Sequence, residues 1–165
     1  MRTRIGVISD SHGDSGHLQQ ALMKLEAGGR LDALIHCGDH ASDADLIGAN
    51  ILQVAAVRGN CDGWLDSHEE EMLLNIGGVT FFIAHGHRYG VKREADTIAE
   101  IAAARGAQIC CFGHTHVPLC EYCRGVLLLN PGACLYTGDC ALITTDGRGG
   151  YSVQMLCREN GTTLP

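Results

Sequence analysis

Short apolar runs alternate with amphipathic stretches over the first two thirds of the chain. Apolar runs bounded by polar or glycine residues are typical of buried strands, and apolar residues at helical spacing are typical of helices packed on a sheet. This pattern predicts strands over 5–8, 33–35, 51–57, 72–76, 79–84 and 107–112, and helices over 15–27, 42–49 and 91–105. Gly77-Gly78 predicts a tight hairpin, and 118–157 predicts further β-hairpins. The alternation favours an α/β fold with helix-covered sheets.

Composition narrows the class of protein. The 165 residues include 12 Lys+Arg and 19 Asp+Glu, which gives a net charge of −7, and 45% are hydrophobic. These values are typical of one globular domain, which we expect over 1–165, with a core at about 4–157 and a polar C-terminal tail at 158–165. The chain has no basic run for a dedicated nucleic-acid clamp, no long apolar span for a membrane and no signal-peptide pattern. We therefore expect a cytoplasmic protein.

The nine cysteines are expected to be reduced and to pack mostly as small apolar side chains. Cys120 and Cys123 form a lone C-x-x-C in a predicted strand and turn. A structural zinc site would need a second pair, so the role of these two residues stays open.

Five polar motifs each follow the end of a predicted strand. They are Asp10-x-His12, Gly38-Asp39, Gly59-Asn60, His85, and His114-x-His116. Ligands of open α/β sheets bind beyond the carboxyl ends of the strands, so these side chains are expected to converge. Carboxylate, amide and imidazole donors suit divalent Mn, Fe, Zn or Ni better than a structural cysteine site does.

The spacing of these motifs favours two neighbouring ions. Residues i and i+2 of an extended loop project the same way, so Asp10 and His12 can bind one ion, and His114 and His116 can serve two. Asp39 is the candidate carboxylate to bridge them. Two such metals can ionise a water between them and stabilise the charge of a phosphoryl transition state.

This ordered set of motifs resembles the calcineurin-like metallophosphoesterase superfamily, in particular the small prokaryotic YfcE-type phosphodiesterases. The resemblance covers residues 4 to 145 and implies a single metallophosphoesterase domain, a four-layer α/β/β/α sandwich with two packed mixed β-sheets. It implies a first metal held by Asp10, His12, Asp39 and His116, and a second held by Asp39, Asn60, His85 and His114. Asp39, Asn60 and His85 would be the catalytic residues. Manganese is the expected metal, with iron, nickel or zinc as alternatives.

The chain departs from the superfamily pattern at two positions. Many members have a histidine where Cys61 stands, and a neutral thiol is a poor proton donor. The wider family also has an aspartate at position 42, where this chain has Ser42, with Asp43 one place later.

Two nearby residues are candidates for contacts to the substrate or to the metal ligands. His87 lies two residues after His85, and Arg58 precedes Gly59. His87 could contact phosphate or simply be exposed, and Arg58 could meet a phosphate oxygen or form an outward salt bridge.

The sequence thus predicts a hydrolase, a metal-dependent phosphodiesterase that attacks small phosphodiesters with a hydroxide held between two divalent ions. One alternative is a non-catalytic scaffold on the same fold, as in the retromer subunit similar to this family. Another is a phosphomonoesterase or nuclease with the same site. The family habit further suggests a homo-oligomer, a dimer or a tetramer.

Overall fold

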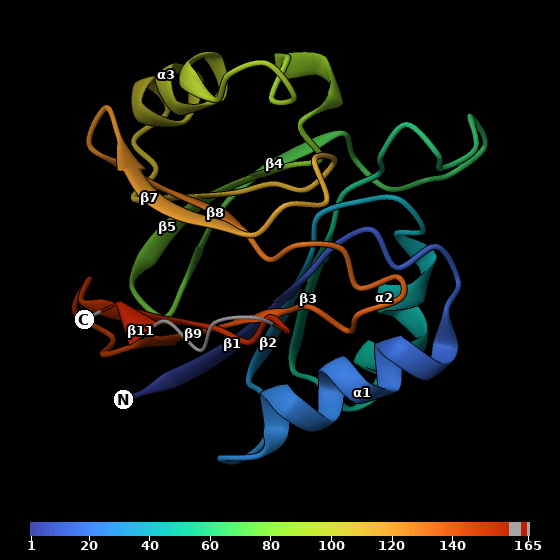
Figure 1. Ribbon diagram of the computed structural model, residues 1–165. Coiled ribbons are helices and arrows are strands. Elements are labelled where there is room, and N and C mark those ends of the chain that lie inside the picture. Colours follow the sequence, from blue (N-terminus) through green and yellow to red (C-terminus); the bar gives the residue numbers. More distant parts are fainter. Residues whose placement is uncertain (159–162, 165) are drawn as a thin grey trace.

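Two mixed β-sheets lie face to face in the computed structural model, which describes residues 1–158 and 163–164, and helices cover their outer faces (Figure 1). The first sheet has the order β11-β10-β9-β1-β2-β3, and the second has the order β4-β5-β6-β8-β7. The predicted four-layer α/β/β/α sandwich is confirmed.

The strands of the first sheet are β1 (Thr3–Ile8), β2 (Ala33–His36), β3 (Gln53–Ala56), β9 (Ala141–Thr145), β10 (Tyr151–Met155) and β11 (Thr163–Leu164). Those of the second are β4 (Glu71–Ile76), β5 (Val79–Ala84), β6 (Ile109–Cys111), β7 (Leu119–Cys123) and β8 (Val126–Asn130). The helices are α1 (Ser15–Glu26), α2 (Ser42–Ile47) and α3 (Asp96–Ala104), with 3₁₀ turns η1 (Gly48–Asn50) and η2 (His87–Tyr89).

The central strands are apolar on both faces because both faces are covered. In β5, Phe81 and Ile83 pack between the two sheets, whereas Phe82 and Ala84 pack toward α3. In β1, Ile5 and Val7 likewise face the inter-sheet layer. The short uninterrupted apolar runs of the sequence are therefore the middle layers of the sandwich.

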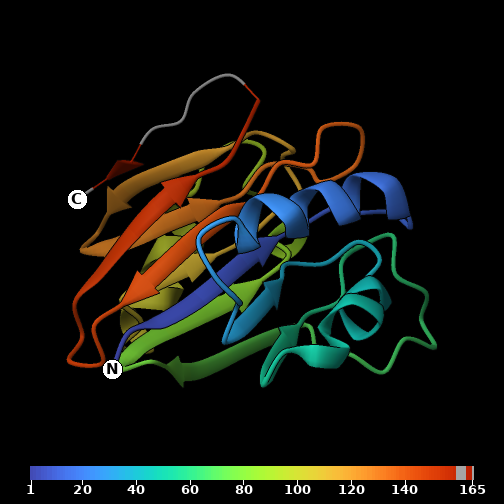
Figure 2. The ribbon, with the colours of Figure 1, turned by 90° about the horizontal axis from the view of Figure 1, so that it is seen from below.

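The helices cover the outer faces with the apolar residues that the sequence spaces at helical intervals. In Figure 2, α1 lies across the first sheet, on which it buries Leu18 and Leu25. The Asp14 carboxylate accepts the His17 N–H and caps this helix. Ile98 and Ala102 of α3 are buried on the second sheet.

Some predicted elements differ in their bounds from the observed ones. The strands expected over 51–57 and 107–112 are shorter, and the helix expected from Val91 begins at Asp96. Gly90 is left-handed (φ 66°), and its carbonyl accepts the N–H groups of Arg93 and Glu94, so this segment makes turns before the helix starts. Val91 is still buried, which explains its apolar character.

The chain termini and the hairpin add two observations. Gly77 and Gly78 both have positive φ values (58° and 82°), which is the geometry of the predicted two-residue turn.

Residues 159–162 and 165 of the predicted polar tail lie outside the described residues, and Thr163–Leu164 pair with β10. Over the described part of the chain, no helix is long and apolar enough to cross a membrane.

Parallel pairing decides where the polar motifs end up. Strands β1, β2 and β3 are parallel in one sheet, and β5, β6 and β8 are parallel in the other. Their carboxyl ends lead directly into the polar motifs, and hydrogen bonds join the two groups of loops, such as the one between His85 Nδ1 and the Cys37 carbonyl (2.7 Å).

Phe81 provides a test of the inter-sheet core. Phe81→Ala removes a fully buried ring and should lower the free energy of unfolding by about 3–5 kcal/mol. Leu52, which is 92% exposed, is the control, because Leu52→Ala removes no core contact and should change stability by less than about 0.5 kcal/mol. Urea denaturation of both variants measures the difference, and equal losses would contradict this description of the core.

Candidate metal centre

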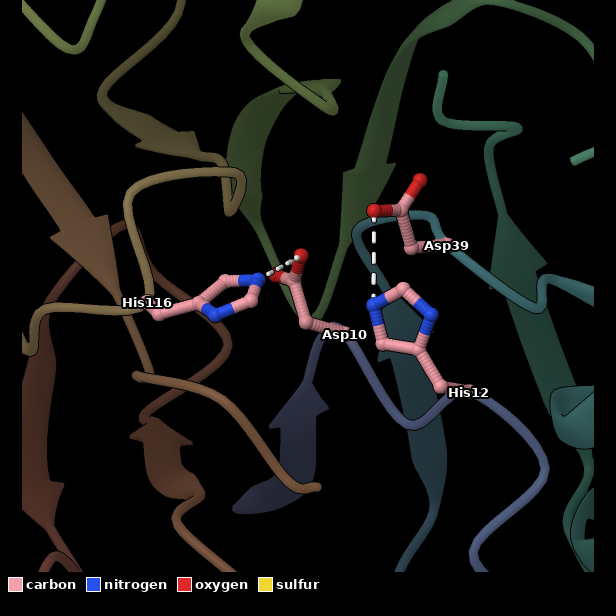
Figure 3. Close-up of side chains that lie close together, drawn as sticks. All are labelled: Asp10, His12, Asp39 and His116. Carbon is pink, nitrogen blue, oxygen red and sulfur yellow. Dashed lines mark hydrogen bonds and ion pairs between the residues drawn. The ribbon is translucent and has the colours of Figure 1, made fainter. Parts of the chain in front are cut away.

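Four predicted ligands lie together at the ends of strands from both sheets. Ligand atoms of Asp10, His12, Asp39 and His116 all lie within 4.8 Å of one another. Figure 3 shows His116 directed at Asp10 and His12 directed at Asp39, with Nε2–Oδ1 and Nε2–Oδ2 distances of 3.0 and 3.5 Å. The two aspartates are buried, and His116 is exposed, so the cluster opens to solvent on one side. These four are the residues expected to hold the first metal.

A second group of donors faces the other side of Asp39. His85 Nε2 lies 3.1 Å from Asn60 Oδ1 and 3.4 Å from Asp39 Oδ1. The ring of His114 packs against that of His85 with the centroids 5.1 Å apart. The expected second set therefore gathers around His85, although Asn60 itself is exposed.

The chemistry of this second group fits a cation. The Cys37 carbonyl can only accept, so His85 Nδ1 carries a proton and Nε2 is left to face the oxygens of Asn60 and Asp39. Acceptors directed at one another need a proton or a cation between them. Burial lowers the pKa of His85, but the carboxylates of Asp39 and Asp10 outweigh it and raise the pKa overall.

Asp39 is held in its ionised form. Burial raises the pKa of its carboxyl group, but a protonated His85 ring and the hydrogen bond from the Cys61 N–H (2.9 Å) outweigh burial and lower the pKa well below its usual value. Its two oxygens face different histidines, Oδ2 toward His12 and Oδ1 toward His85. This arrangement is what a bridging carboxylate requires.

The backbone around the candidate ligands is strained. Eight non-glycine residues of the described chain have positive φ values, and six of them lie in these loops: Asp10, His12, Asp39, His40, His114 and His116. Such conformations cost free energy and cluster at functional sites, where the surrounding structure has to hold them in place.

Asp62 holds two of these loops together. Its Oδ1 accepts the N–H groups of His40 (2.8 Å) and Ala41 (3.0 Å), and its Oδ2 accepts those of Asp39 (3.0 Å) and Gly59 (2.6 Å). The sequence motifs did not predict this role for Asp62. Its position directly after the Gly59-Asn60 motif was the available signal.

Asp43 holds the first loop. Its Oδ2 accepts the Ser11 hydroxyl (2.6 Å) and the Gly13 N–H (2.9 Å). Ser11 Oγ also accepts from His36 Nε2 (2.8 Å), and His36 Nδ1 accepts the Gly38 N–H (3.1 Å). The shift of this aspartate to position 43 therefore leaves it able to support the Asp10-x-His12 loop.

Asn130, at the end of β8, supports the last loop. Its Nδ2 donates to the Gly113 carbonyl (2.9 Å) and to Thr115 Oγ1 (3.0 Å), and its Oδ1 accepts the Gly132 N–H (3.0 Å). Nothing in the local sequence distinguishes it from an ordinary turn asparagine. The motif glycine itself is required, since a Cβ at Gly113 would overlap the Ser9 hydroxyl.

The thiol of Cys61 is neutral at neutral pH. Burial and Asp39 both raise the pKa of this exposed thiol, whose Sγ lies 3.5 Å from Asn60 Nδ2. Cys120 and Cys123 are free, half-buried residues on β7, and each packs against a different core layer. Within the described residues they form no metal cluster.

His87 and Arg58 have different surroundings. Arg58 pairs with Glu70 (2.9 Å), in agreement with the salt-bridge alternative for this residue. His87 Nδ1 is buried without a hydrogen-bond partner among the described residues, and its ring centroid is 5.5 Å from that of His85. It is thus not the freely exposed side chain of the second alternative, and its contact with phosphate stays a prediction.

A family profile described as the calcineurin-like phosphoesterase superfamily domain matches residues 3–146. The chain belongs to this superfamily. It is 37% identical over 127 residues to the probable metallophosphoesterase YsnB of Bacillus subtilis, covering 77% of this chain and 72% of that protein. It is 30% identical over 150 residues to the phosphodiesterase MJ0936 of Methanocaldococcus jannaschii, covering 79% and 84%.

Further comparisons agree with the branch inferred from the motifs. The phosphodiesterase YfcE of Escherichia coli is 29% identical over 92 residues, covering 49% of this chain and 44% of that protein. A crystal structure of a predicted phosphoesterase from Streptococcus pneumoniae has a TM-score of 0.72 at 26% identity, covering 100% and 94%. Vacuolar Protein Sorting 29 from Cryptosporidium parvum has a TM-score of 0.78 at 16% identity, covering 99% and 95%, which shows a shared fold alone.

His36 makes stability depend on pH. Burial lowers the pKa of His36 to about 4 from 6.5, so the unfolded chain takes up a proton first as pH falls. This residue should therefore contribute a loss of about 3 kcal/mol in the free energy of unfolding between pH 6.5 and 4, with no such loss above 6.5. Urea denaturation of the metal-free protein across this range measures the loss, and His36→Gln, which lacks the titrating ring, should show a smaller slope. Parallel pH profiles would contradict the assignment.

Asp62→Asn tests the support of the Asp39 loop. An amide has a single acceptor oxygen, so some of the four backbone N–H groups lose their partner, and we expect metal affinity to fall by about 10–100-fold. The control is Asp146→Asn, because Asp146 also accepts two backbone N–H groups (from Arg148 and Gly150) but lies in the β9–β10 turn. Manganese titration of both folded variants measures the difference. Full affinity in Asp62→Asn would show that the loop does not need this carboxylate.

Proposed function

We propose that this protein hydrolyses small phosphodiesters with two divalent metal ions, manganese being the expected metal. The observation that carries the proposal is the division of the Asp39 carboxylate between two groups of donors, with Oδ2 facing His12 and Oδ1 facing His85. A mononuclear site would not need a second set of nitrogen and oxygen donors on the far side of the same carboxylate. Membership of the superfamily and the phosphodiesterase names of two relatives support the reaction class.

The proposed ligand sets follow the two groups. Asp10, His12, Asp39 and His116 would hold one ion, and Asp39, Asn60, His85 and His114 would hold the other. Bound there, the two ions would lower the pKa of a water molecule and offset the charge of the phosphoryl group in the transition state.

The chain's own residues orient this chemistry. The carbonyl of Cys37 fixes the His85 tautomer so that Nε2 points at the centre. The Asp62 carboxylate and the Asn130 amide hold loops from the two sheets at fixed positions, which limits reorganisation during the reaction. The neutral Cys61 thiol is a weak proton donor, so we expect the best substrates to have acidic leaving groups.

The scaffold alternative differs from the enzyme in its metal content. The Vps29 likeness is one of fold, and the donor residues of this chain are present at every motif position. A folded protein that binds no metal would support the scaffold, and about two manganese ions per chain would support the enzyme.

The activity itself is tested with bis(4-nitrophenyl) phosphate and added manganese. Asp39→Asn removes the shared charge, and we expect the rate to fall by about 10³-fold or more. Asp146→Asn is the matched control on the remote turn and should stay within about twofold of the unsubstituted protein. Elemental analysis of the same samples gives the number of metals. An unchanged rate in Asp39→Asn, or no turnover by the metal-loaded protein, would end the proposal.

A further inference from the structure

A cavity of about 460 Å³ lies directly beside the candidate metal centre. It is formed by the end of β3, the segment leading into β4, and the end of β5 with η2. His85 belongs both to this cavity and to the donor group around Asp39, so the cavity adjoins the place where a phosphoryl group would sit. A ligand bound at the metals can therefore extend into it.

The cavity wall alternates donors and acceptors. Glu70 lies between two arginines, with Arg58 Nη2 at 2.9 Å from its Oε1 and an Arg88 guanidinium nitrogen in contact with its Oε2. Beside it, Glu71 accepts the Tyr89 hydroxyl and pairs with Arg105 (2.6 Å). The positive and negative charges of this wall are thus closely balanced.

The wall discriminates against other kinds of group. Ala84 and Gly86 offer too little apolar surface for an acyl chain, and the Tyr89 ring packs edge-on against Phe82 (6.2 Å) instead of presenting a free stacking platform. A second phosphate would have to compete with Glu70 for Arg58 and Arg88, which already pair with that carboxylate, and would lie close to its negative charge, which is unfavourable for an anion. An uncharged polar group is the kind of ligand that this wall can still accommodate. The arrangement Arg–Glu–Arg can both donate hydrogen bonds to adjacent hydroxyls and accept them.

His87 adds an unused polar atom at the same wall. Its buried Nδ1 has no partner in the described structure, and its ring lines the cavity next to that of His85, with the centroids 5.5 Å apart. A buried polar nitrogen without a partner costs free energy, and a rotation of the ring that brought it to a bound hydroxyl or phosphoryl oxygen would recover that cost.

We infer that this cavity holds one ester group of the substrate and selects an uncharged group with adjacent hydroxyls, such as glycerol or a sugar. The inference rests on the proposed function, since it assigns the second half of the diester. It also explains why a diester would suit this site better than a simple monoester, which has no group to place among Arg58, Glu70 and Arg88.

Binding is tested by calorimetry of the manganese-loaded protein with glycerol 3-phosphate and methyl phosphate. The two probes share a phosphate monoester and differ in the hydroxyls. Two or more hydrogen bonds between the glycerol hydroxyls and the cavity wall should make glycerol 3-phosphate bind about tenfold more tightly than methyl phosphate. Glu70→Gln and Arg88→Met should reduce that ratio to about twofold or less, since each breaks the alternating wall. Arg88 is largely exposed, so its variant keeps the test valid if Glu70→Gln fails to fold.

The matched control is Glu100→Gln, because Glu100 is also paired with an arginine, Arg124 (3.2 Å), but lies on α3. It should keep the full binding ratio. Turnover is compared in the same way with two diesters, glyceryl 4-nitrophenyl phosphate and methyl 4-nitrophenyl phosphate. We expect the glyceryl ester to be hydrolysed faster, and we expect this preference to be lost in Glu70→Gln and Arg88→Met.

The outcomes separate the two proposals. If both diesters are turned over equally and the binding ratio is near one, the cavity assignment is overturned while the phosphodiesterase function stands. If neither diester is turned over, the proposed function fails. In that case, a binding ratio near one would also overturn the inference that the cavity binds hydroxyl groups. A tenfold ratio that is lost in Arg88→Met would support that inference.

Discussion

The candidate centre depends on the carboxylate of Asp62, which is not a ligand in either proposed set. Asp62 accepts four backbone N–H groups from the loops that follow β2 and β3. Asp39 and His40 are both left-handed, a conformation that non-glycine residues adopt at a cost. The charge-assisted hydrogen bonds to Asp62 offset that cost and hold the shared carboxylate where the donors of both sheets can reach it.

The sandwich brings two sets of parallel strands to the same edge. Asp10, Asp39 and Asn60 follow strands of the first sheet, and His85, His114 and His116 follow strands of the second. Each sheet supplies only part of the donor set, so the centre exists only where the sheets pack. The buried layer between the sheets, which includes Phe81 and Ile35, therefore holds the two parts of the donor set together.

Charge is distributed unevenly around this centre. The chain is acidic overall, with a net charge of −7, and its most buried carboxylates lie at the candidate metal positions. Buried carboxylates without partners would be costly, and divalent cations would neutralise them. In the adjoining cavity, by contrast, the Glu70 carboxylate is already paired with Arg58 and Arg88.

The sequence alone predicted the central strands, an α/β fold with helix-covered sheets and the candidate ligands, whereas the four-layer arrangement came from the family resemblance. Apolar runs buried on both faces predict central strands, and polar residues directly after them predict a site at the strand ends, since both patterns are local. The same reasoning misplaced the start of α3, because the turns at Gly90 depend on backbone hydrogen bonds that Val91 and its apolar spacing do not reveal.

The tertiary structure decided what holds the ligands and what lies beside them. Asp62 bonds to Asp39 across 23 positions and Ser11 to Asp43 across 32, while Asn130 reaches back 17 positions to Gly113. Every residue except proline has the same backbone N–H group, so a sequence cannot show which side chain will accept a hydrogen bond from it. Partner choice follows from how the loops meet in space, and that is why the sequence could propose candidate ligands but not the residues that support their loops.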